Sequence, residues 1–444
     1  MHISIKNLGI VRSAEIDLNG LTILTGNNDT GKSFIGKMIF SVIKTLKNAH
    51  LFYNEIRLME IFSDFNKIMQ AHRTIVNFDV ERVVKFNSDS LKDEISRAFQ
   101  QPKSKESILE KIEKFKNEIE KDISDYIDKN PTLSGNLIAT NKEKIDDNFN
   151  IINLVINEEL NDENVYKSYF NNEIIEYFFE GQINSFNGET LEVKFSEGSS
   201  TLLEMTIENN RVKKFVYNAD NPIFKNDATI IDTPTVLILN HNYAPYRGNP
   251  YNIRPLPFHY VDLLSKIDEI NGSPSPTISN PEVLEEIKNI IGGSAAYNYE
   301  RRTFGFFRNG SDIQIDKSNL ATGIKSFAIL QLLLLSGNIN TNSILIVDEP
   351  EVHLHPKWEI EYAKIIVELS KAGIPILVSS HSPYFLQAVV KYVKDNNTED
   401  ITRFYFGESE KEGINIVSKF KDVTDDLEPI FKALADPMRT IYFK

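Results

Sequence analysis

The sequence predicts an α/β fold in which a mixed sheet and a parallel sheet are flanked by helices, with a helical insertion. Three observations support this prediction. Within residues 1–45, short apolar runs separated by turns precede a glycine-rich loop and a helical stretch. In the C-terminal half, all-apolar runs at 344–347 and 376–378 alternate with helical sequence, which favours a parallel sheet covered by helices. Between these parts, residues 46–180 are charged and helical in pattern.

The first 45 residues predict three strands, a loop and a helix, because the apolar runs are divided by Asn-Gly and Gly turns. In the insertion, apolar residues recur at spacings of three and four, as in an amphipathic helix. This seam lasts only about twenty residues before Asn130-Pro131, which is too short for a long coiled-coil arm. The seam residues are Ile108, Ile112, Phe115, Ile119 and Ile123.

Residues 183–217 alternate between apolar and polar positions and are broken by Asn-Gly, Glu-Gly and Asn-Asn pairs, which predicts a small antiparallel meander. From residue 234 onward, strand-like runs at 236–239, 344–347 and 376–378 alternate with helical ones. These runs predict a further stretch of parallel sheet covered by helices.

Composition excludes several classes of function. The chain has 444 residues, no cysteine and a net charge of −14. Disulfides, thiolate metal sites and cysteine nucleophiles are therefore excluded, and the average charge repels nucleic acid and favours a protein partner. No apolar stretch approaches the ~20 residues that cross a bilayer, and the N-terminus lacks a secretory signal. We expect a cytoplasmic protein without membrane association.

The glycine-rich loop has the spacing G-x-x-x-x-G-K-S and lies between a predicted strand and a predicted helix, as in a Walker A motif. Its backbone N–H groups would wrap the phosphates of ATP, Lys32 would reach the β- and γ-phosphates, and the Ser33 hydroxyl would bind Mg²⁺. The competing interpretation is a glycine-rich turn that caps a helix. The predicted nucleotide-binding residues here are Gly26, Asn27, Asn28, Thr30, Gly31, Lys32 and Ser33.

Two buried strands are followed by polar residues that fit the same chemistry. Asp348 and Glu349 follow the run 344–347, so Asp348 can reach the metal through water and Glu349 can polarise the attacking water. His381 follows the run 376–378, where it could donate to the γ-phosphate. Alternatively, the acids merely end a strand in solvent and the histidine is structural.

In this order and spacing, the motifs resemble the ATP-binding-cassette branch of P-loop ATPases, which includes SMC proteins. The resemblance is closest to stand-alone ATPases related to the overcoming-lysogenisation-defect (OLD) nucleases, whose extended Walker B is similar to residues 348–356, Asp-Glu-Pro-Glu-Val-His-Leu-His-Pro. The resemblance covers about residues 1–45 and 230–444. Together with the sequence pattern, it predicts one ATPase domain made of residues 1–45, the meander at 181–230 and residues 231–444, interrupted by an insertion at 46–180.

The resemblance also implies a head-to-tail homodimer or higher homo-oligomer, in which a signature loop caps the γ-phosphate bound by a second subunit. By this resemblance, Thr322 and Gly323 would contact the γ-phosphate. The sequence has Ala321 where the family usually has serine and Ile324 where it usually has Glu or Gln, so we expect weaker contacts and slow hydrolysis. Arg12 resembles a phosphate-facing arginine, the alternative being a surface charge.

Two further segments match the family less well. No glutamine stands where the family's Q-loop is expected, and Asn240 is the candidate substitute. The run after Glu349 resembles a dimer-facing loop, and its two histidines, His353 and His355, leave a metal site as the competing interpretation.

We expect the family's nuclease half to be absent, because no Asp-x-Asp pair occurs among the residues after His381. The resemblance therefore implies an ATPase that controls a separate effector protein, a nuclease or toxin, in bacterial anti-phage defence, with nucleic acid contacted through that partner. One alternative is an SMC-like DNA-repair ATPase, which binds DNA through three arginines and three phenylalanines. Another is the nucleotide-binding subunit of a transporter. The DNA-binding cluster would comprise Arg301, Arg302, Arg308, Phe304, Phe306 and Phe307.

Overall fold

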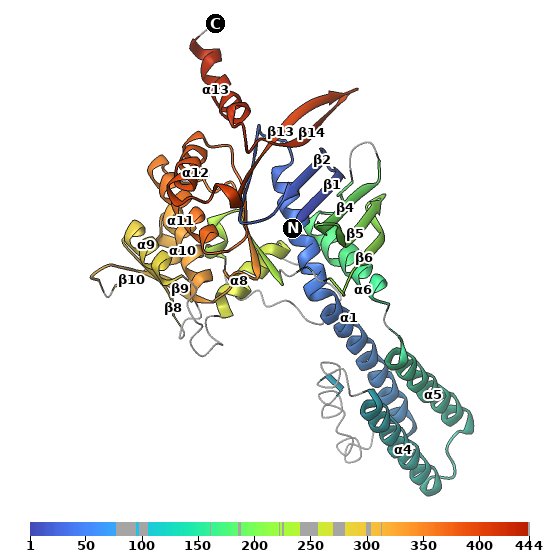
Figure 1. Ribbon diagram of the computed structural model, residues 1–444. Helices are drawn as coiled ribbons and strands as arrows, with labels where there is room; N and C mark the ends of the chain where they lie inside the picture. Colours follow the sequence, from blue (N-terminus) through green and yellow to red (C-terminus); the bar gives the residue numbers. More distant parts are fainter. Residues whose placement is uncertain are drawn as a thin grey trace. The chain divides into compact units, whose positions relative to one another are not determined.

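The computed structural model describes residues 1–76, 95–96, 105–159, 161–184, 188–221, 223, 226–239, 256–269, 280–298, 303–311 and 313–442. These residues divide into two compact units, one formed by 1–47 and 166–444 and the other by 48–165. Figure 1 shows the order of the elements along the chain. None of the described helices is both long and apolar enough to cross a membrane.

The larger unit is built on an eleven-stranded mixed sheet with the order β6-β5-β4-β1-β2-β14-β13-β3-β12-β11-β7. At one end of the sheet, strands β3, β12, β11 and β7 run parallel to one another, and β13 runs parallel to β3. The predicted fold class is confirmed, but the two predicted sheets are one continuous sheet. Its strands are β1 (His2–Leu8), β2 (Val11–Asp17), β3 (Leu21–Gly26), β4 (Leu191–Glu197), β5 (Ser200–Glu208), β6 (Arg211–Tyr217), β7 (Asp227–Ile231), β11 (Ser343–Asp348), β12 (Ile376–Ser379), β13 (Thr402–Glu412) and β14 (Asn415–Asp422).

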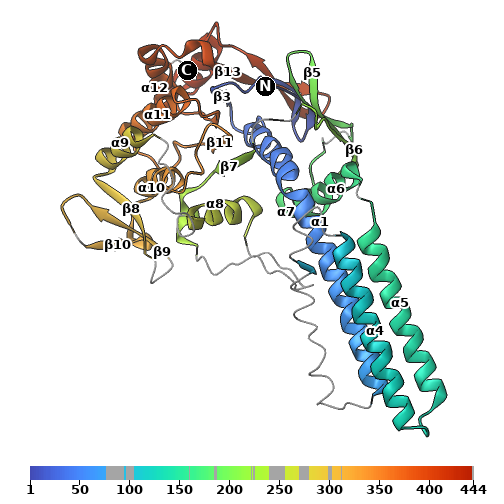
Figure 2. The ribbon, with the colours of Figure 1, turned by 60° about the horizontal axis from the view of Figure 1, so that its bottom comes forward.

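Helices cover both faces of the parallel part, which explains why its strands are apolar without alternation. Leu345 and Val347 of β11 belong to the core formed with the helices of one face, which Figure 2 shows on one side of these strands. Ile346 points the other way, against Gly36 of α1 (Lys32–Ile75). The helices of the larger unit after α1 are α7 (Glu176–Phe178), α8 (Phe258–Asp268), α9 (Pro281–Ile291), α10 (Thr322–Leu335), α11 (Pro356–Lys371), α12 (Pro383–Asn396) and α13 (Glu428–Tyr442).

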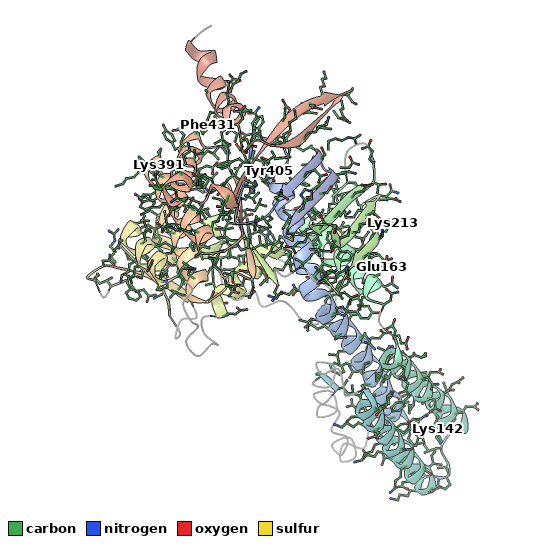
Figure 3. The ribbon with its side chains drawn as sticks, in the orientation of Figure 1. Lys142, Glu163, Lys213, Lys391, Tyr405 and Phe431 are labelled. Atoms are coloured by element: carbon green, nitrogen blue, oxygen red, sulfur yellow. The ribbon has the colours of Figure 1, made fainter. Side chains whose placement is uncertain are left out.

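The antiparallel part contains the predicted meander, formed by β4, β5 and β6. The hairpin β13–β14 joins this part to the parallel strands, since β14 pairs with β2 and β13 pairs with β3. Tyr405 of β13, labelled in Figure 3, is buried, and its hydroxyl accepts a hydrogen bond of 2.8 Å from the backbone N–H of Asp17. The sheet is therefore continuous across its middle.

One strand prediction is wrong. Residues 236–239 are not a strand, because residues 234–238 form a 3₁₀ turn, η2 (Pro234–Ile238), and the strand lies earlier, as β7. The physical reason is Pro234, which has no N–H to donate to a neighbouring strand, while the Thr233 hydroxyl accepts from the N–H of Thr235 and starts the turn.

The smaller unit is helical and has a core of its own. It contains the later part of α1, which continues well beyond residue 45, together with α4 (Lys105–Lys129) and α5 (Gly135–Asn157). All five predicted seam residues of α4 are buried in this core. The short elements α6 (Asp162–Tyr169) and η1 (Phe170–Ile175) lead the chain back to the sheet of the larger unit.

A separate three-stranded antiparallel sheet precedes α10 and consists of β8 (Gly293–Asn298), β9 (Thr303–Arg308) and β10 (Gln314–Asp316). Phe304 and Phe306 are fully buried in the core beneath it. These two rings cannot stack on bases, so this part of the predicted DNA-binding cluster is wrong. Arg301 and Arg302 lie outside the described residues.

Candidate functional site

The glycine-rich loop connects β3 to α1 and requires glycine at both ends for steric reasons. Gly26 has φ 145°, and a Cβ there would lie 2.7 Å from the carbonyl oxygen of Gly407. Gly31 has φ 85°, and its Cβ would lie 2.4 Å from a methyl group of Val11. Asn27 and Asn28 are exposed at the tip of the loop.

The loop is fixed by the C-terminal hairpin, which the sequence did not indicate. The Ser418 hydroxyl on β14 donates a hydrogen bond of 2.6 Å to the carbonyl oxygen of Thr30. The Thr30 hydroxyl in turn donates to the carbonyl oxygen of Asn27 at 3.0 Å. Residues almost 400 positions away in the chain therefore set the shape of the loop.

Lys32, the first residue of α1, is buried inside this loop. Its ammonium group donates to the carbonyl oxygens of Gly26 at 3.1 Å and Asn27 at 2.9 Å. Burial lowers the pKa of Lys32, and the carboxylates of Glu349 and Asp348 oppose that shift. A cation at this position faces the loop where phosphates are expected to lie.

Asp348 and Ser33 lie together at the carboxyl ends of the parallel strands. The Ser33 hydroxyl donates to Asp348 Oδ1 at 3.0 Å, and the Ser379 hydroxyl donates to the same oxygen. Asp348 and Ser379 are direct neighbours in the β11–β12 register, which brings the two strand ends to one edge. These oxygens are the hard ligands that Mg²⁺ prefers.

The side chains after β11 and β12 also converge. Glu349 has φ 47°, which turns the chain sharply after the strand, and its N–H donates to the carbonyl oxygen of Ser379 at 2.9 Å. His381 Nδ1 lies 3.5 Å from Glu349 Oε1 and 3.4 Å from Glu351 Oε1. Lys32, the adjacent pair Asp348 and Glu349, and His381 come from three distant segments of the chain and are thus grouped around one edge of the sheet.

Glu351 organises this edge, a role that its place in the sequence did not reveal. Its side chain is buried, and Oε1 accepts from the N–H groups of His381 at 2.7 Å and Ser382 at 3.1 Å. The Ser380 hydroxyl donates to the same oxygen at 2.9 Å. Burial raises the pKa of Glu351. One buried carboxylate therefore holds the segment that carries His381.

A small cavity of about 10 Å³, near the minimum for one water molecule, lies between these strand ends and α1. Its polar and charged lining comprises Lys32, Ser33, Lys37, Asp348 and Ser379, together with Asp232, which follows β7. Asp232 was not among the predicted site residues.

The remaining predicted residues lie elsewhere. Thr322 and Gly323 form the first turn of α10, and no hydrogen bond, ion pair or cavity described in the structure connects them with Lys32 or Asp348. Gly323 is buried against the Trp358 ring, where a Cβ would lie 2.6 Å from two ring carbons. Close packing against Trp358 is therefore enough to explain a glycine at this position, whether or not it contacts a nucleotide.

Arg12 is paired with acids. Its guanidinium contacts Glu189 and lies 3.8 Å from Glu412 Oε1, and it donates to Asn7 Oδ1 at 2.8 Å. These contacts would have to be exchanged before Arg12 could bind a phosphate, so that role stays a prediction. Asn240, the candidate Q-loop substitute, lies outside the described residues.

His355 has a structural role. It precedes α11, and its Nδ1 accepts from the N–H of Lys357 at 3.3 Å, so it caps that helix. Over the described part of the chain, His, Asp and Glu side chains form no group of three or more arranged to hold a metal ion. The two-histidine metal site therefore has no further ligands among those residues.

Comparison with known proteins gives one family. A family model described as "AAA ATPase domain" matches residues 1–386. No curated protein matches the sequence significantly.

Solved structures match loosely over nearly the whole chain. They include the SMC head domain from Thermotoga maritima, with a TM-score of 0.39, 10% identity and coverage of 95% of this chain and 98% of that one. A second is the Smc head domain with a coiled coil and joint from Pyrococcus yayanosii, with a TM-score of 0.35, 12% identity and coverage of 98% and 99%.

Proposed function

Because the chain belongs to the AAA ATPase domain family, we propose that it binds Mg-ATP at the carboxyl ends of β3, β11 and β12 and hydrolyses it. The observation that carries the proposal is the hydrogen bond of 3.0 Å between Ser33 and Asp348, beside the buried ammonium group of Lys32. A hydroxyl and a carboxylate in contact at a helix N-terminus provide both halves of a magnesium–phosphate site.

Each side chain has a distinct part in the proposed reaction. Lys32 exchanges its carbonyl partners for the β- and γ-phosphates, and Ser33 and Asp348 would hold the Mg²⁺, which neutralises phosphate charge when bound. Glu349 accepts the proton of the water that attacks the γ-phosphorus. His381 donates to the γ-phosphate, with its backbone fixed by Glu351.

The test separates nucleotide binding from hydrolysis. The Glu349→Gln variant should bind a fluorescent ATP analogue with wild-type affinity but turn over ATP about 10²–10⁴-fold more slowly. Glu399→Gln, at an exposed position on the 3₁₀ turn after α12, serves as the matched control and should keep wild-type turnover. A wild-type chain that binds no ATP would end the proposal.

We further propose that ATP joins two copies head to tail and that the dimer controls a separate effector protein, a nuclease or toxin in anti-phage defence. The support is the similarity of residues 348–356 to the OLD-type extended Walker B. The acidic net charge of −14 favours a protein partner over direct DNA binding.

Light scattering tests the dimer with the hydrolysis-deficient chain. Glu349→Gln should double in mass when Mg-ATP is added, and Thr322→Ala should weaken that association if Thr322 contacts the nucleotide of the second copy. Co-expression with the product of a neighbouring gene, followed by gel filtration with and without ATP, tests the effector. Retention of a nuclease or toxin in only one nucleotide state would support control of an effector. A chain that stays monomeric with ATP would refute the proposed dimer.

A further inference from the structure

Asp232 occupies a place beside Asp348 that the proposed ATPase chemistry has not used. Strand β7 pairs with β11 in parallel, and the register aligns Ile231 with Val347. The next residues, Asp232 and Asp348, therefore emerge side by side at the same edge of the sheet. Both line the small cavity that Lys32 and Ser33 also line.

A buried histidine holds the Asp232 carboxylate in position. His259 of α8 is 4% exposed, and its Nε2 donates to Asp232 Oδ2 at 2.8 Å. The Tyr260 hydroxyl donates to the same oxygen at 3.4 Å. The imidazole is itself packed between aromatic rings, with centroids 5.1 Å from Phe178 and 4.2 Å from Tyr260. The orientation of this carboxylate is therefore fixed by its neighbours.

Only one of the two carboxylate oxygens is used in this way. Asp232 Oδ1 makes no hydrogen bond with any residue that the structure describes, whereas Oδ2 receives both. The side chain is 23% exposed, so the free oxygen is open to a ligand. Carboxylates that bind metal ions are commonly held in place by hydrogen bonds from neighbouring side chains, as this one is.

We propose that Asp232 is a second carboxylate for the Mg²⁺ of the nucleotide site and that His259 is its positioning residue. The inference rests on the proposed Mg-ATP binding. Asp348 and Ser33 offer two protein oxygens, and a second carboxylate adds a further hard oxygen ligand of the kind that Mg²⁺ prefers. The cavity between Asp232 and Asp348 has room for one ion or one water molecule.

The competing explanation is a purely structural pair that fastens α8 to the end of β7. The two explanations differ in how the affinity for ATP depends on magnesium. A second carboxylate contributes only when the metal is present, whereas a structural pair changes nucleotide affinity equally with and without it.

The experiment measures the affinity for a fluorescent ATP analogue in excess Mg²⁺ and in EDTA, and takes the ratio as the magnesium enhancement. Asp232→Asn keeps an acceptor for His259 but loses the charge, so the enhancement should fall about tenfold while the affinity in EDTA stays at the wild-type value. Asp232→Glu should retain most of the enhancement. Asp316→Asn, at an Asp that caps the turn before α10, is the control and should change nothing.

The positioning role is tested through His259. Its replacement by Gln keeps an N–H donor and should preserve the enhancement, whereas His259→Phe removes the donor and should lower it several-fold. His259→Phe also provides the test if Asp232→Asn does not fold, which circular dichroism melting would reveal. An unchanged enhancement in Asp232→Asn or in a folded His259→Phe would overturn the inference and leave Mg-ATP binding intact. Failure of the wild type to bind the analogue would instead refute the proposed function.

Discussion

Replacing Gly323 by Ala tests whether this glycine is required for packing or for contact with a nucleotide. The new Cβ would lie 2.6 Å from Cε3 and Cζ3 of Trp358 and 3.3 Å from a methyl group of Leu354. Ordinary carbon contacts are about 3.5–4.0 Å, so the overlap with the ring is about 1 Å. The ring cannot easily swing away, because it packs edge-on against Phe327 at a centroid distance of 5.9 Å.

The size of the effect follows from two opposing terms. Overpacking a core position costs about 1–3 kcal/mol, and the better helix propensity of Ala returns up to about 1 kcal/mol. Gly323→Ala should therefore lower the free energy of unfolding by about 1–2 kcal/mol. Gly135→Ala is the matched control, because Gly135 is also at a helix start but has no atom within 4 Å of an added Cβ. That change should stabilise the chain slightly.

Two measurements follow the perturbation. Trp358 is the only tryptophan in the sequence, so its fluorescence reports directly on the contact with Gly323, while urea unfolding followed by circular dichroism gives the stability. In a Trp358→Leu background, Gly323→Ala should cost almost nothing, giving a coupling of about 1–2 kcal/mol. A cost that persists without the ring, or no cost at all, would refute the packing argument. If Gly323→Ala in the Trp358→Leu background costs no stability but still has low ATP turnover, Gly323 contacts the nucleotide.

Two further perturbations test charged groups of the larger unit. Burial and the hydrogen bond with Glu286 raise the pKa of Glu368 to about 7, so the stability that its protonated form contributes is present below about pH 4.5 and is lost as pH rises through 7. Glu368→Gln stays neutral and should therefore be more stable than wild type at pH 8 and equal to it at pH 4.5, as urea unfolding at both values would reveal. Lys44→Met should lower the free energy of unfolding by about 2 kcal/mol at pH 7, because Asp227 and Asp262 lose a buried partner at 2.5 Å and keep only Lys266 as a buried partner, at 3.2 and 3.1 Å. Lys47→Met removes a half-exposed partner of Asp227 and should cost about 1 kcal/mol or less in the same assay.

The sequence predicted the site best where the functional residues belong to short, contiguous motifs. The strand–loop–helix around Lys32 and the apolar strand before Asp348 both follow from local pattern, because a buried parallel strand must be apolar on both faces. The convergence of Asp348 and His381 on one edge also follows from general rules for parallel sheets.

The sequence was least informative where position depends on pairing between distant segments. Nothing near Ser418 marks it as a partner of Thr30, since that contact depends on β14 lying against β2. Strand β7 was missed because its apolar part is short, and the stronger apolar run after Pro234 forms a turn. Asp232 was missed with it, because a residue at a strand end is recognised only after the strand itself is placed.

The buried pair between Lys44 and Asp227 has a consequence for the proposed metal site. Lys44 lies eleven residues after Ser33, about 16 Å along α1 at 1.5 Å per residue. Asp232 lies five residues after Asp227, which is also about 16 Å along β7 at 3.3 Å per residue. Because α1 begins at the edge of the sheet toward which β7 runs, the Lys44–Asp227 ion pair joins two points that are about equally far from that edge, where Ser33 and Asp232 line the same cavity. An ion pair one strand length away from the nucleotide site therefore sets the spacing of two groups proposed to hold its metal.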